Sequence, residues 1–219
     1  MSDSNPILGS RDRIEREVAS IQALQSRLQR HLASYGYVPV EVPLLERSDL
    51  YLRKLGSQMA ALMFNMTDHR GERLSLRPEF TGSVVRCFID QVERLNLPVR
   101  WQYCGPVFRD RDTAGGVLRQ FTQFGCELIG AAGSRADAEL LAVAAQAMLA
   151  LGLPKPRVVI GHAGLAPALL AGLRLSERAL LFITTNLGLL RAGEAGLAKL
   201  EEGLANLERT SPEIADGTD

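Results

Sequence analysis

The chain has 219 residues, of which 46% are hydrophobic and 23% charged, a composition typical of a globular protein with a sizeable core. Its 25 basic and 25 acidic residues cancel, which excludes an overall field that would draw it to nucleic acid or an anionic membrane. The N-terminal sequence has neither a basic region nor an apolar run, and no later window reaches the roughly 18 uninterrupted apolar residues of a membrane span. We therefore expect a cytoplasmic protein without a membrane partner.

The first half of the chain alternates between helical and extended patterns. Residues 11–34 place apolar side chains at steps of three and four, which predicts a one-sided helix. In residues 36–43, valine occurs at every second position, and two prolines interrupt the segment. This pattern is typical of a short edge strand. Residues 60–79 read as a hairpin around the polar turn TDHRGER, and residues 80–93 return to helical spacing.

The second half begins with two long strands, at 99–109 and 117–129, joined by a glycine-containing turn. The segment SRAD at 134–137 predicts a capping box that opens an alanine-rich helix. RVVIG at 157–161 reads as a short strand, and residues 164–208 are mostly helical in pattern. Hairpins with helices before and after them predict an α+β fold, with a mostly antiparallel sheet covered on one side.

The three cysteines, Cys87, Cys104 and Cys126, are 17 and 22 residues apart. This spacing fits neither a disulfide framework nor a CxxC metal site. We interpret them as reduced thiols of the core, and we expect neither a metal nor a cofactor.

Charged and amide side chains on the 99–129 hairpin are the main candidates for a site. Side chains alternate between the faces of a strand, so Gln123 and Glu127 share a face, and a tight turn would add Arg109 to it. One interpretation is the floor of a ligand pocket, with Gly105 and Gly125 letting the ligand approach the backbone. The other is a solvent-exposed face on which Arg109 and Glu127 pair weakly. Alternation leaves both open.

The residues resemble a known family in two segments, LSLRPEFTGSVVR at 74–86 and WQYCGPVFRD…LRQFTQFGCELIG at 101–130. They are similar to the Leu-Arg-Pro-Glu-x-Thr segment and the motif 2 hairpin of the histidyl-tRNA synthetase-like class II aminoacyl-tRNA synthetases. The segment YGYVPVEVPLLE at 35–46 resembles their motif 1. The resemblance covers roughly residues 10–175 and implies a class II synthetase-like sheet flanked by helices.

This family resemblance also implies a domain organisation. We expect a partial synthetase-like core at 1–172 and a helical appendage at 173–219 that resembles the family's insertion region. Chains of the family continue past this point into the motif 3 strands, so the resemblance implies a shortened or truncated chain. Class II folds usually pair through the motif 1 region, which implies a homodimer.

The resemblance assigns roles to five residues. Glu79, Thr81, Gln123 and Glu127 would hold the α-amino group of histidine, a task suited to carboxylate, amide and hydroxyl oxygens because an ammonium group has three donors. Arg109 would be the motif 2 arginine, which in active enzymes binds the amino-acid carboxylate and the α-phosphate through its planar, permanently charged fork.

This sequence departs from the family's pattern at positions that bind ATP in active synthetases and in the segment that binds the imidazole ring of histidine. Active synthetases carry a glutamate that contacts adenine two residues after the motif 2 arginine, where this chain has Arg111, and a basic residue where it has Val117. The Arg-Gly-Leu-Asp-Tyr-Tyr segment and the motif 3 arginine are absent from this sequence. Each lost charge-assisted contact is worth about 1.5–3 kcal/mol. We therefore expect no aminoacylation, and no tRNA partner.

A last segment, VVIGHAGLAPALLAGLRLS at 158–176, resembles the Gly-His-x-Gly-Leu segment of a paralogous family, the regulatory subunits of ATP phosphoribosyltransferase. That resemblance implies a non-catalytic subunit that acts with the short-form catalytic subunit in the first step of histidine biosynthesis. Histidine would be its feedback ligand, and the homodimer would lie within a hetero-oligomer. His162 could instead only cap a turn.

Two alternatives stay open beside this interpretation. The chain could be a histidine–tRNA ligase, or a fragment of one, that activates histidine with ATP. It could also be a structural dimer module with a vestigial pocket.

Overall fold

The computed structural model describes residues 6–52, 60–173 and 175–209. The chain divides into two compact units, an N-terminal unit, Met1–Arg157, and a C-terminal unit, Val158–Asp219. The division precedes the boundary expected after residue 172. That a synthetase-like core extends to residue 172 stays a prediction.

The main sheet of the N-terminal unit has the strand order β1-β5-β6. Its strands are β1 (Val38–Pro39), β5 (Val99–Phe108) and β6 (Gln120–Ile129). The last two form the expected long antiparallel hairpin, paired from Val99 opposite Ile129 to Phe108 opposite Gln120. A short 3-10 helix, η2 (Ala114–Gly116), lies in the connection. The strand β1 pairs in parallel with β5 at the sheet edge, as the prolines in its segment indicate.

A second, smaller antiparallel sheet has the order β2-β4-β3. Its strands are β2 (Leu45–Arg47), β4 (Arg73–Leu76) and β3 (Asn65–Thr67), and the helix α2 (Ser48–Leu52) follows β2. The hairpin expected at residues 60–79 is confirmed as β3 and β4. The strand β2 was not predicted from the sequence, and it pairs with β4 across a long separation in the chain.

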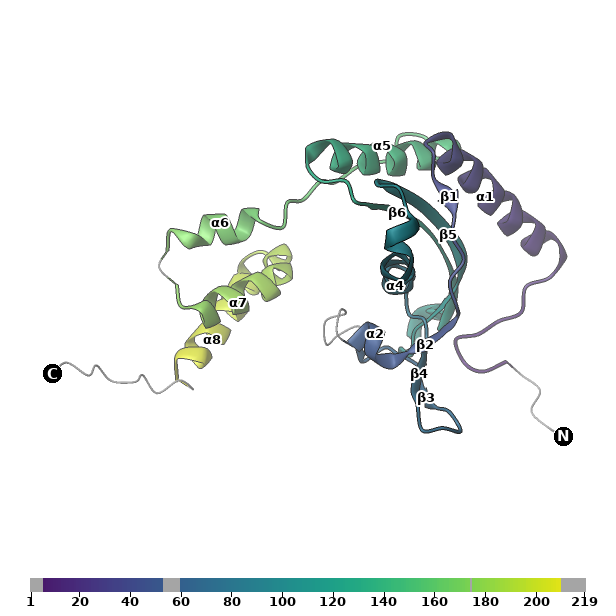
Figure 1. Cartoon of the computed structure of the whole chain (residues 1–219). Coiled ribbons are helices and arrows are strands. Elements are labelled where there is room, and N and C mark those ends of the chain that lie inside the picture. Colours follow the sequence, from purple (N-terminus) through teal and green to yellow (C-terminus); the bar gives the residue numbers. More distant parts are fainter. Residues whose placement is uncertain (1–5, 53–59, 174, 210–219) are drawn as a thin grey trace. The chain divides into compact units, whose positions relative to one another are not determined.

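Helices lie against both faces of the long hairpin (Figure 1). They are α1 (Glu15–Ser34), α4 (Thr81–Gln91), continued by the 3-10 helix η1 (Val92–Arg94), and α5 (Ser134–Ala150). We call the face that contacts α4 the inner face, and the face that contacts α1 and α5 the outer face. The expectation of a sheet covered on one side is wrong, because α1 and α5 also contact each other and pack on the outer face.

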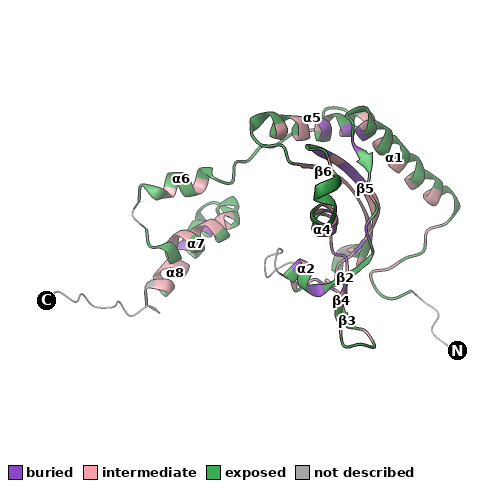
Figure 2. Cartoon of the chain, viewed as in Figure 1, coloured by how far each residue is buried: buried purple, intermediate pink, exposed green. Residues whose placement is uncertain are grey.

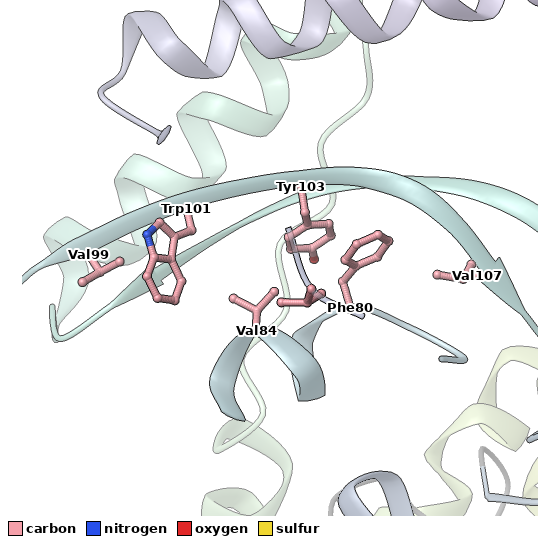
Figure 3. Close-up of a cluster of buried hydrophobic side chains, with 7 residues drawn as sticks. Phe80, Val84, Val99, Trp101, Tyr103 and Val107 are labelled. Carbon is pink, nitrogen blue, oxygen red and sulfur yellow. The ribbon is translucent and has the colours of Figure 1, made fainter. Parts of the chain in front are cut away.

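Each face contributes to a hydrophobic cluster, which is what holds the layers together. The inner cluster is shown in Figure 3 and consists of Val42, Phe80, Val84, Val99, Trp101, Tyr103 and Val107. The outer cluster consists of Leu32, Tyr37 and Val143, with Phe124, Cys126 and Leu140 packed against it. The three cysteines are free thiols and half-buried. Burial raises the pKa of Cys104 and, with the charge of Glu127 next, that of Cys126 to about 11.

Two local predictions are wrong. The helix α5 has Gly133 as its N-cap residue, with φ of 91° and no side-chain cap, so the capping box at 134–137 is not formed. The Gly133 carbonyl accepts hydrogen bonds from the N–H groups of Ala136 and Asp137 instead. The segment RVVIG is not a strand, because no described strand pairs with it, and Val158–Ile160 is exposed.

The C-terminal unit is helical, as expected. Its elements are α6 (Leu165–Ala171), α7 (Glu177–Asn186), the 3-10 helix η3 (Leu187–Ala192) and α8 (Glu194–Arg209). Exposed and half-buried side chains predominate in these helices (Figure 2). His162 Nδ1 accepts a hydrogen bond of 3.1 Å from the Gly164 N–H, which confirms that this histidine caps a turn. No helix in the described residues is both long and apolar enough to cross a membrane.

Candidate functional site

The register of β5 and β6 brings the predicted hairpin residues to the inner face. Glu127 lies opposite Trp101, and Gln123 lies opposite Gly105. The Arg109 N–H continues the ladder with a 2.8 Å hydrogen bond to the Arg119 carbonyl. The interpretation of this face as solvent-exposed is wrong, because it packs against the inner cluster. Within the described part of the chain, Arg109 and Glu127 form no ion pair with each other.

Glu127 is the centre of a hydrogen-bonded group, the Glu127 cluster, formed with Thr81 and Tyr103. Its Oε1 accepts hydrogen bonds from the Thr81 hydroxyl at 2.8 Å and from the Tyr103 hydroxyl at 3.1 Å. Burial and then the charge of Glu127 raise the pKa of Tyr103. The three residues come from α4, β5 and β6, so tertiary folding assembles them. A carboxylate oxygen held this way has a fixed orientation and can accept further hydrogen bonds from an ammonium group.

Glu79 has a positioning role next to this cluster. Its Oε2 accepts a hydrogen bond from the Thr81 N–H and its Oε1 one of 2.8 Å from the Gly82 N–H, at the start of α4. The first N–H groups of a helix have no intrahelical partner, and an anionic side chain stabilises that end. Thr81 therefore connects the two carboxylates, through its backbone to Glu79 and through its hydroxyl to Glu127.

Gln123 presents a buried acceptor. Its Oε1 has no hydrogen-bond partner within the described residues. Leaving such an atom unsatisfied costs about 1–3 kcal/mol, and native proteins rarely accept that cost without a reason. A donor on a bound molecule would satisfy this oxygen.

The two hairpin glycines have a different role from the one expected. A Cβ at Gly125 would lie 2.5 Å from the Tyr103 hydroxyl oxygen, and a Cβ at Gly105 would lie 2.7 Å from Arg77 Nη2 and 3.2 Å from Phe80 Cζ. The protein's own side chains fill the space above both glycines. The expectation that they let a ligand approach the backbone is therefore wrong.

The side chains above the glycines form a continuous stack. The Phe80 and Tyr103 rings are parallel within 9°, with centroids 4.4 Å apart (Figure 3). On Phe80 lies the Arg77 guanidinium, whose carbon is 3.8 Å from the ring centroid. It donates to the carbonyls of Pro106 at 2.9 Å and Val42 at 2.8 Å, and burial lowers its pKa. No role for Arg77 or Tyr103 was predicted from the sequence, although an arginine directly after a predicted strand was a usable signal.

The opposite end of the inner face carries two arginines, which we call the arginine pair. Arg109 Nε donates to the Pro78 carbonyl at 3.0 Å, and Arg111 donates to the Leu118 carbonyl at 3.0 and 3.3 Å. Their guanidinium carbons are 5.1 and 5.3 Å from the centroid of one ring, that of Phe121. Burial and then the charge of Arg111 lower the pKa of Arg109.

A cavity of about 1070 Å³ runs along the edge of β5, and its lining includes Arg77, Gln102 and Tyr103. None of the five predicted ligand residues lines it. Gln102 is 2% exposed, and its Oε1 has no partner among the described residues. The cavity reaches the aromatic stack from the sheet edge, whereas the predicted residues lie on the inner face.

Comparison with known proteins identifies the family. The family model described as histidyl-tRNA synthetase matches residues 9–187. The chain belongs to the histidyl-tRNA synthetase family. Members carry both names considered above. A histidine–tRNA ligase of Methanocaldococcus jannaschii is 33% identical over 77% of the chain, and an ATP phosphoribosyltransferase regulatory subunit of Anaeromyxobacter sp. (strain K) is 35% identical over 78%.

The chain covers 40% of the length of the first of these relatives and 49% of the second. Among solved structures, an ATP phosphoribosyltransferase regulatory subunit/histidyl-tRNA synthetase from Bacillus halodurans matches 85% of this chain and 50% of its own, with a TM-score of 0.75 and 26% identity. The apo histidyl-tRNA synthetase of S. aureus matches 68% of this chain and 35% of its own, with a TM-score of 0.58 and 30% identity. The class II synthetase-like α+β fold is thereby confirmed.

Proposed function

We propose that the chain is a non-catalytic regulatory subunit of ATP phosphoribosyltransferase. It acts with the short-form catalytic subunit in the first step of histidine biosynthesis, in the cytoplasm, and conveys feedback inhibition by histidine. A homodimer within a hetero-oligomer is the expected assembly. Two relatives from Anaeromyxobacter that carry the regulatory-subunit name, each 35% identical over 78% of the chain, support this function.

The observation that carries the proposal is the contrast between the two ends of the inner face. The Glu127 cluster presents oriented oxygens to an amino group. At the position where active synthetases are expected to contact adenine through a glutamate, this chain has Arg111, whose guanidinium lies over Phe121. A guanidinium only donates hydrogen bonds, so it cannot accept one from the adenine amino group as a carboxylate does. The amino-acid half of the site is retained and the adenine half is altered.

In this proposal, Glu79, Thr81, Gln123 and Glu127 hold the α-amino group of histidine, and Arg109 faces its carboxylate. Histidine shifts the assembly only by its difference in affinity for two states of the complex. The ligand site must therefore contact an element that differs between the inhibited and the active complex. The helix α4 begins at Thr81 and is a candidate for that element.

The test is histidine inhibition of the reconstituted complex with the short-form catalytic subunit. Glu127→Gln keeps an oxygen for Thr81 and Tyr103 but removes the negative charge. We expect it to raise the histidine concentration for half-inhibition at least tenfold, the effect of losing about 1.4 kcal/mol of binding. Glu93→Gln, on the exposed η1, makes the same change of charge and is the matched control. An unchanged inhibition curve for Glu127→Gln would exclude the sensing role.

The second candidate is a histidine–tRNA ligase, favoured by the 33% identity to the Methanocaldococcus jannaschii enzyme. Histidine-dependent exchange between ATP and pyrophosphate separates the two functions. We expect no exchange above a sample without histidine, since Arg111 replaces the adenine acceptor. Exchange that depends on both histidine and Arg109 would establish the ligase activity instead.

A further inference from the structure

We propose that the cavity at the edge of β5 binds a small apolar carboxylic acid that has an N–H or O–H donor and no ammonium group, such as an N-acylated amino acid. The polar groups of this site are the side chains of Arg77 and Gln102, which both line the cavity. The proposed function gives neither of them a role, so the inference stands independently of histidine sensing.

The cavity exists because the strand β1 leaves β5 early. The two residues of β1 pair with β5, and a hydrogen bond of 2.9 Å from the Val40 N–H to the Gln102 carbonyl follows them. Beyond this point Arg77 bridges the gap, with hydrogen bonds to the carbonyls of Val42 at 2.8 Å and Pro106 at 2.9 Å. A buried side chain thus fixes the width of the cavity, and a preformed site loses little conformational entropy on binding.

The amide of Gln102 offers the cavity an acceptor. Gln102 is 2% exposed, and its Nε2 donates to the Tyr37 carbonyl at 2.8 Å and to the Gln29 carbonyl at 3.2 Å. These two bonds use both amide protons and so fix the orientation of the amide. The Gln102 Oε1 has no partner within the described residues, and an unsatisfied buried acceptor is unfavourable. An N–H or O–H donor of a ligand would satisfy this oxygen.

The guanidinium of Arg77 gives the cavity a positive charge. Arg77 is 5% exposed and forms no ion pair with a carboxylate in the described part of the chain. Its Nε and Nη1 donate to main-chain carbonyls, whereas Nη2 makes no hydrogen bond among the described residues. Nη2 lies over Gly105, where a Cβ would be only 2.7 Å away. A buried charge without a counter-ion is unfavourable, and an anion that accepts from Nη2 would relieve this cost.

The charge of the cavity and its walls decide the class of ligand. The lining includes the apolar side chains of Val40, Val42 and Phe80, and small-molecule sites are typically apolar cavities of about 300–1000 Å³ with few polar groups. One carboxylate balances the single guanidinium, whereas a dianion would leave an excess charge among apolar side chains. An ammonium group has three donors but would meet one buried acceptor, since Glu41, the carboxylate in the lining, is exposed. A single N–H or O–H donor fits that acceptor better.

The test is titration calorimetry of the full chain with N-acetylleucine, which has a carboxylate, one amide N–H and an apolar side chain. Three analogues each change one group: N-acetylleucinamide lacks the negative charge, N-acetyl-N-methylleucine lacks the N–H, and leucine has an ammonium group. We expect each analogue to bind about tenfold more weakly than N-acetylleucine. Absence of N-acetylleucine binding, or equal affinity for all four compounds, would overturn the proposal.

Two variants test whether the ligand lies in this cavity. Glu41→Gln removes a like charge from the lining and should strengthen the binding of N-acetylleucine about twofold, without changing that of N-acetylleucinamide. Glu93→Gln, on the exposed η1, makes the same change of charge outside the lining and is the matched control. In Gln102→Leu, with its fold checked by circular dichroism, N-acetyl-N-methylleucine should bind as tightly as N-acetylleucine.

The exposed Glu41 tests the location even where Gln102→Leu does not fold. N-acetylleucine affinities that are equal in the natural chain, Glu41→Gln and Glu93→Gln would assign the binding to another part of the chain and overturn the proposal. Histidine should not displace N-acetylleucine, and displacement would overturn the separation of the two sites. Inhibition of the complex by histidine without N-acetylleucine binding removes this proposal and leaves the proposed function.

The oligomeric state is measured in the same samples by sedimentation, because residues 39–44 of the lining lie in the segment that resembles motif 1. We expect the same affinity for N-acetylleucine below and above the protein concentration at which the chain dimerises. Binding that is lost in the dimer would assign the cavity to a second copy of the chain and would also overturn the proposal.

Discussion

The two ends of the inner face of the β5-β6 hairpin differ in which groups form hydrogen bonds with the charged side chain. At one end, Glu127 accepts hydrogen bonds from Thr81 and Tyr103. At the other, Arg109 and Arg111 donate only to backbone carbonyls among the described residues, and they share the ring of Phe121. The carboxylate accepts hydrogen bonds from side chains of α4 and β5, whereas the arginines donate hydrogen bonds to main-chain carbonyls.

Because of this difference, we expect one end to tolerate substitution better than the other without loss of the fold. Replacing Glu127 disturbs contacts that connect three elements, and Tyr103 and Phe80 belong to the inner cluster beside it. Replacing Arg111 disturbs its bonds to one loop carbonyl and a partly exposed ring. We therefore expect the arginine end of the inner face to tolerate substitution better than the Glu127 end, which packing constrains.

The largest expected effect concerns the packing beside the Glu127 cluster. Gly125→Ala places a methyl group within 2.5–2.7 Å of the Tyr103 ring and hydroxyl, which the stack with Phe80 holds in place. Overpacking of this kind costs about 1–3 kcal/mol of unfolding free energy, measured by urea denaturation. Gly161→Ala, where the new Cβ meets nothing within 4 Å, is the control. In a Tyr103→Ala background the cost should largely disappear, and a cost that persists there would rule out the collision.

A smaller effect is expected from the Tyr103 hydroxyl. Tyr103→Phe removes its hydrogen bond to Glu127 and should cost about 1 kcal/mol of stability at pH 7. The pKa of Tyr103 is raised in the folded state. The stability advantage of the natural chain over Tyr103→Phe is therefore fully present below the pKa of an unfolded tyrosine, about 10. It then declines by up to about 1.4 kcal/mol per pH unit as the pH rises further, since only the unfolded tyrosine ionises.

Denaturation of both proteins between pH 7 and 11.5 measures this prediction. Tyr35→Phe, at a residue that is 38% exposed, is the control and should not show the loss of stability at pH 7. A stability difference between the natural chain and Tyr103→Phe that stays constant up to pH 11.5 would contradict the account of Tyr103.

The smallest effect is expected at the arginine end. Phe121→Leu keeps an apolar side chain but removes the ring that both guanidinium groups face. Each partly exposed cation–π contact is worth about 0.5–1 kcal/mol, so the part of the stability loss that depends on Arg111 should be about that amount. The loss should be smaller in an Arg111→Gln background, and a double-mutant cycle measures the difference. Strictly additive losses would show that Arg111 and the ring do not interact.

Much of this architecture followed from local patterns. The spacing in residues 11–34 and the alternation in residues 117–129 predicted a helix and a strand, which the structure has at Glu15–Ser34 and Gln120–Ile129, because helix and strand periods depend only on neighbouring residues. Alternation also placed Gln123 and Glu127 on one face, which the register confirms. The segment around Val158–Ile160 has a strand pattern but no described partner, and a strand requires one.

Local sequence patterns are sufficient to predict the helix periods, the long hairpin and the sorting of its side chains onto two faces, since each depends on backbone geometry over a few residues. The side chains that lie above those faces depend on tertiary packing. Tyr103 covers Gly125, Glu79 caps α4, and Arg77 lies on Phe80 above Gly105. These contacts join α4, β5 and β6 or the segments beside them, and their distances depend on how the layers pack. Local patterns could not show that side chains from other segments fill the space above Gly105 and Gly125, which is why one interpretation of the sequence was a pocket floor at these glycines.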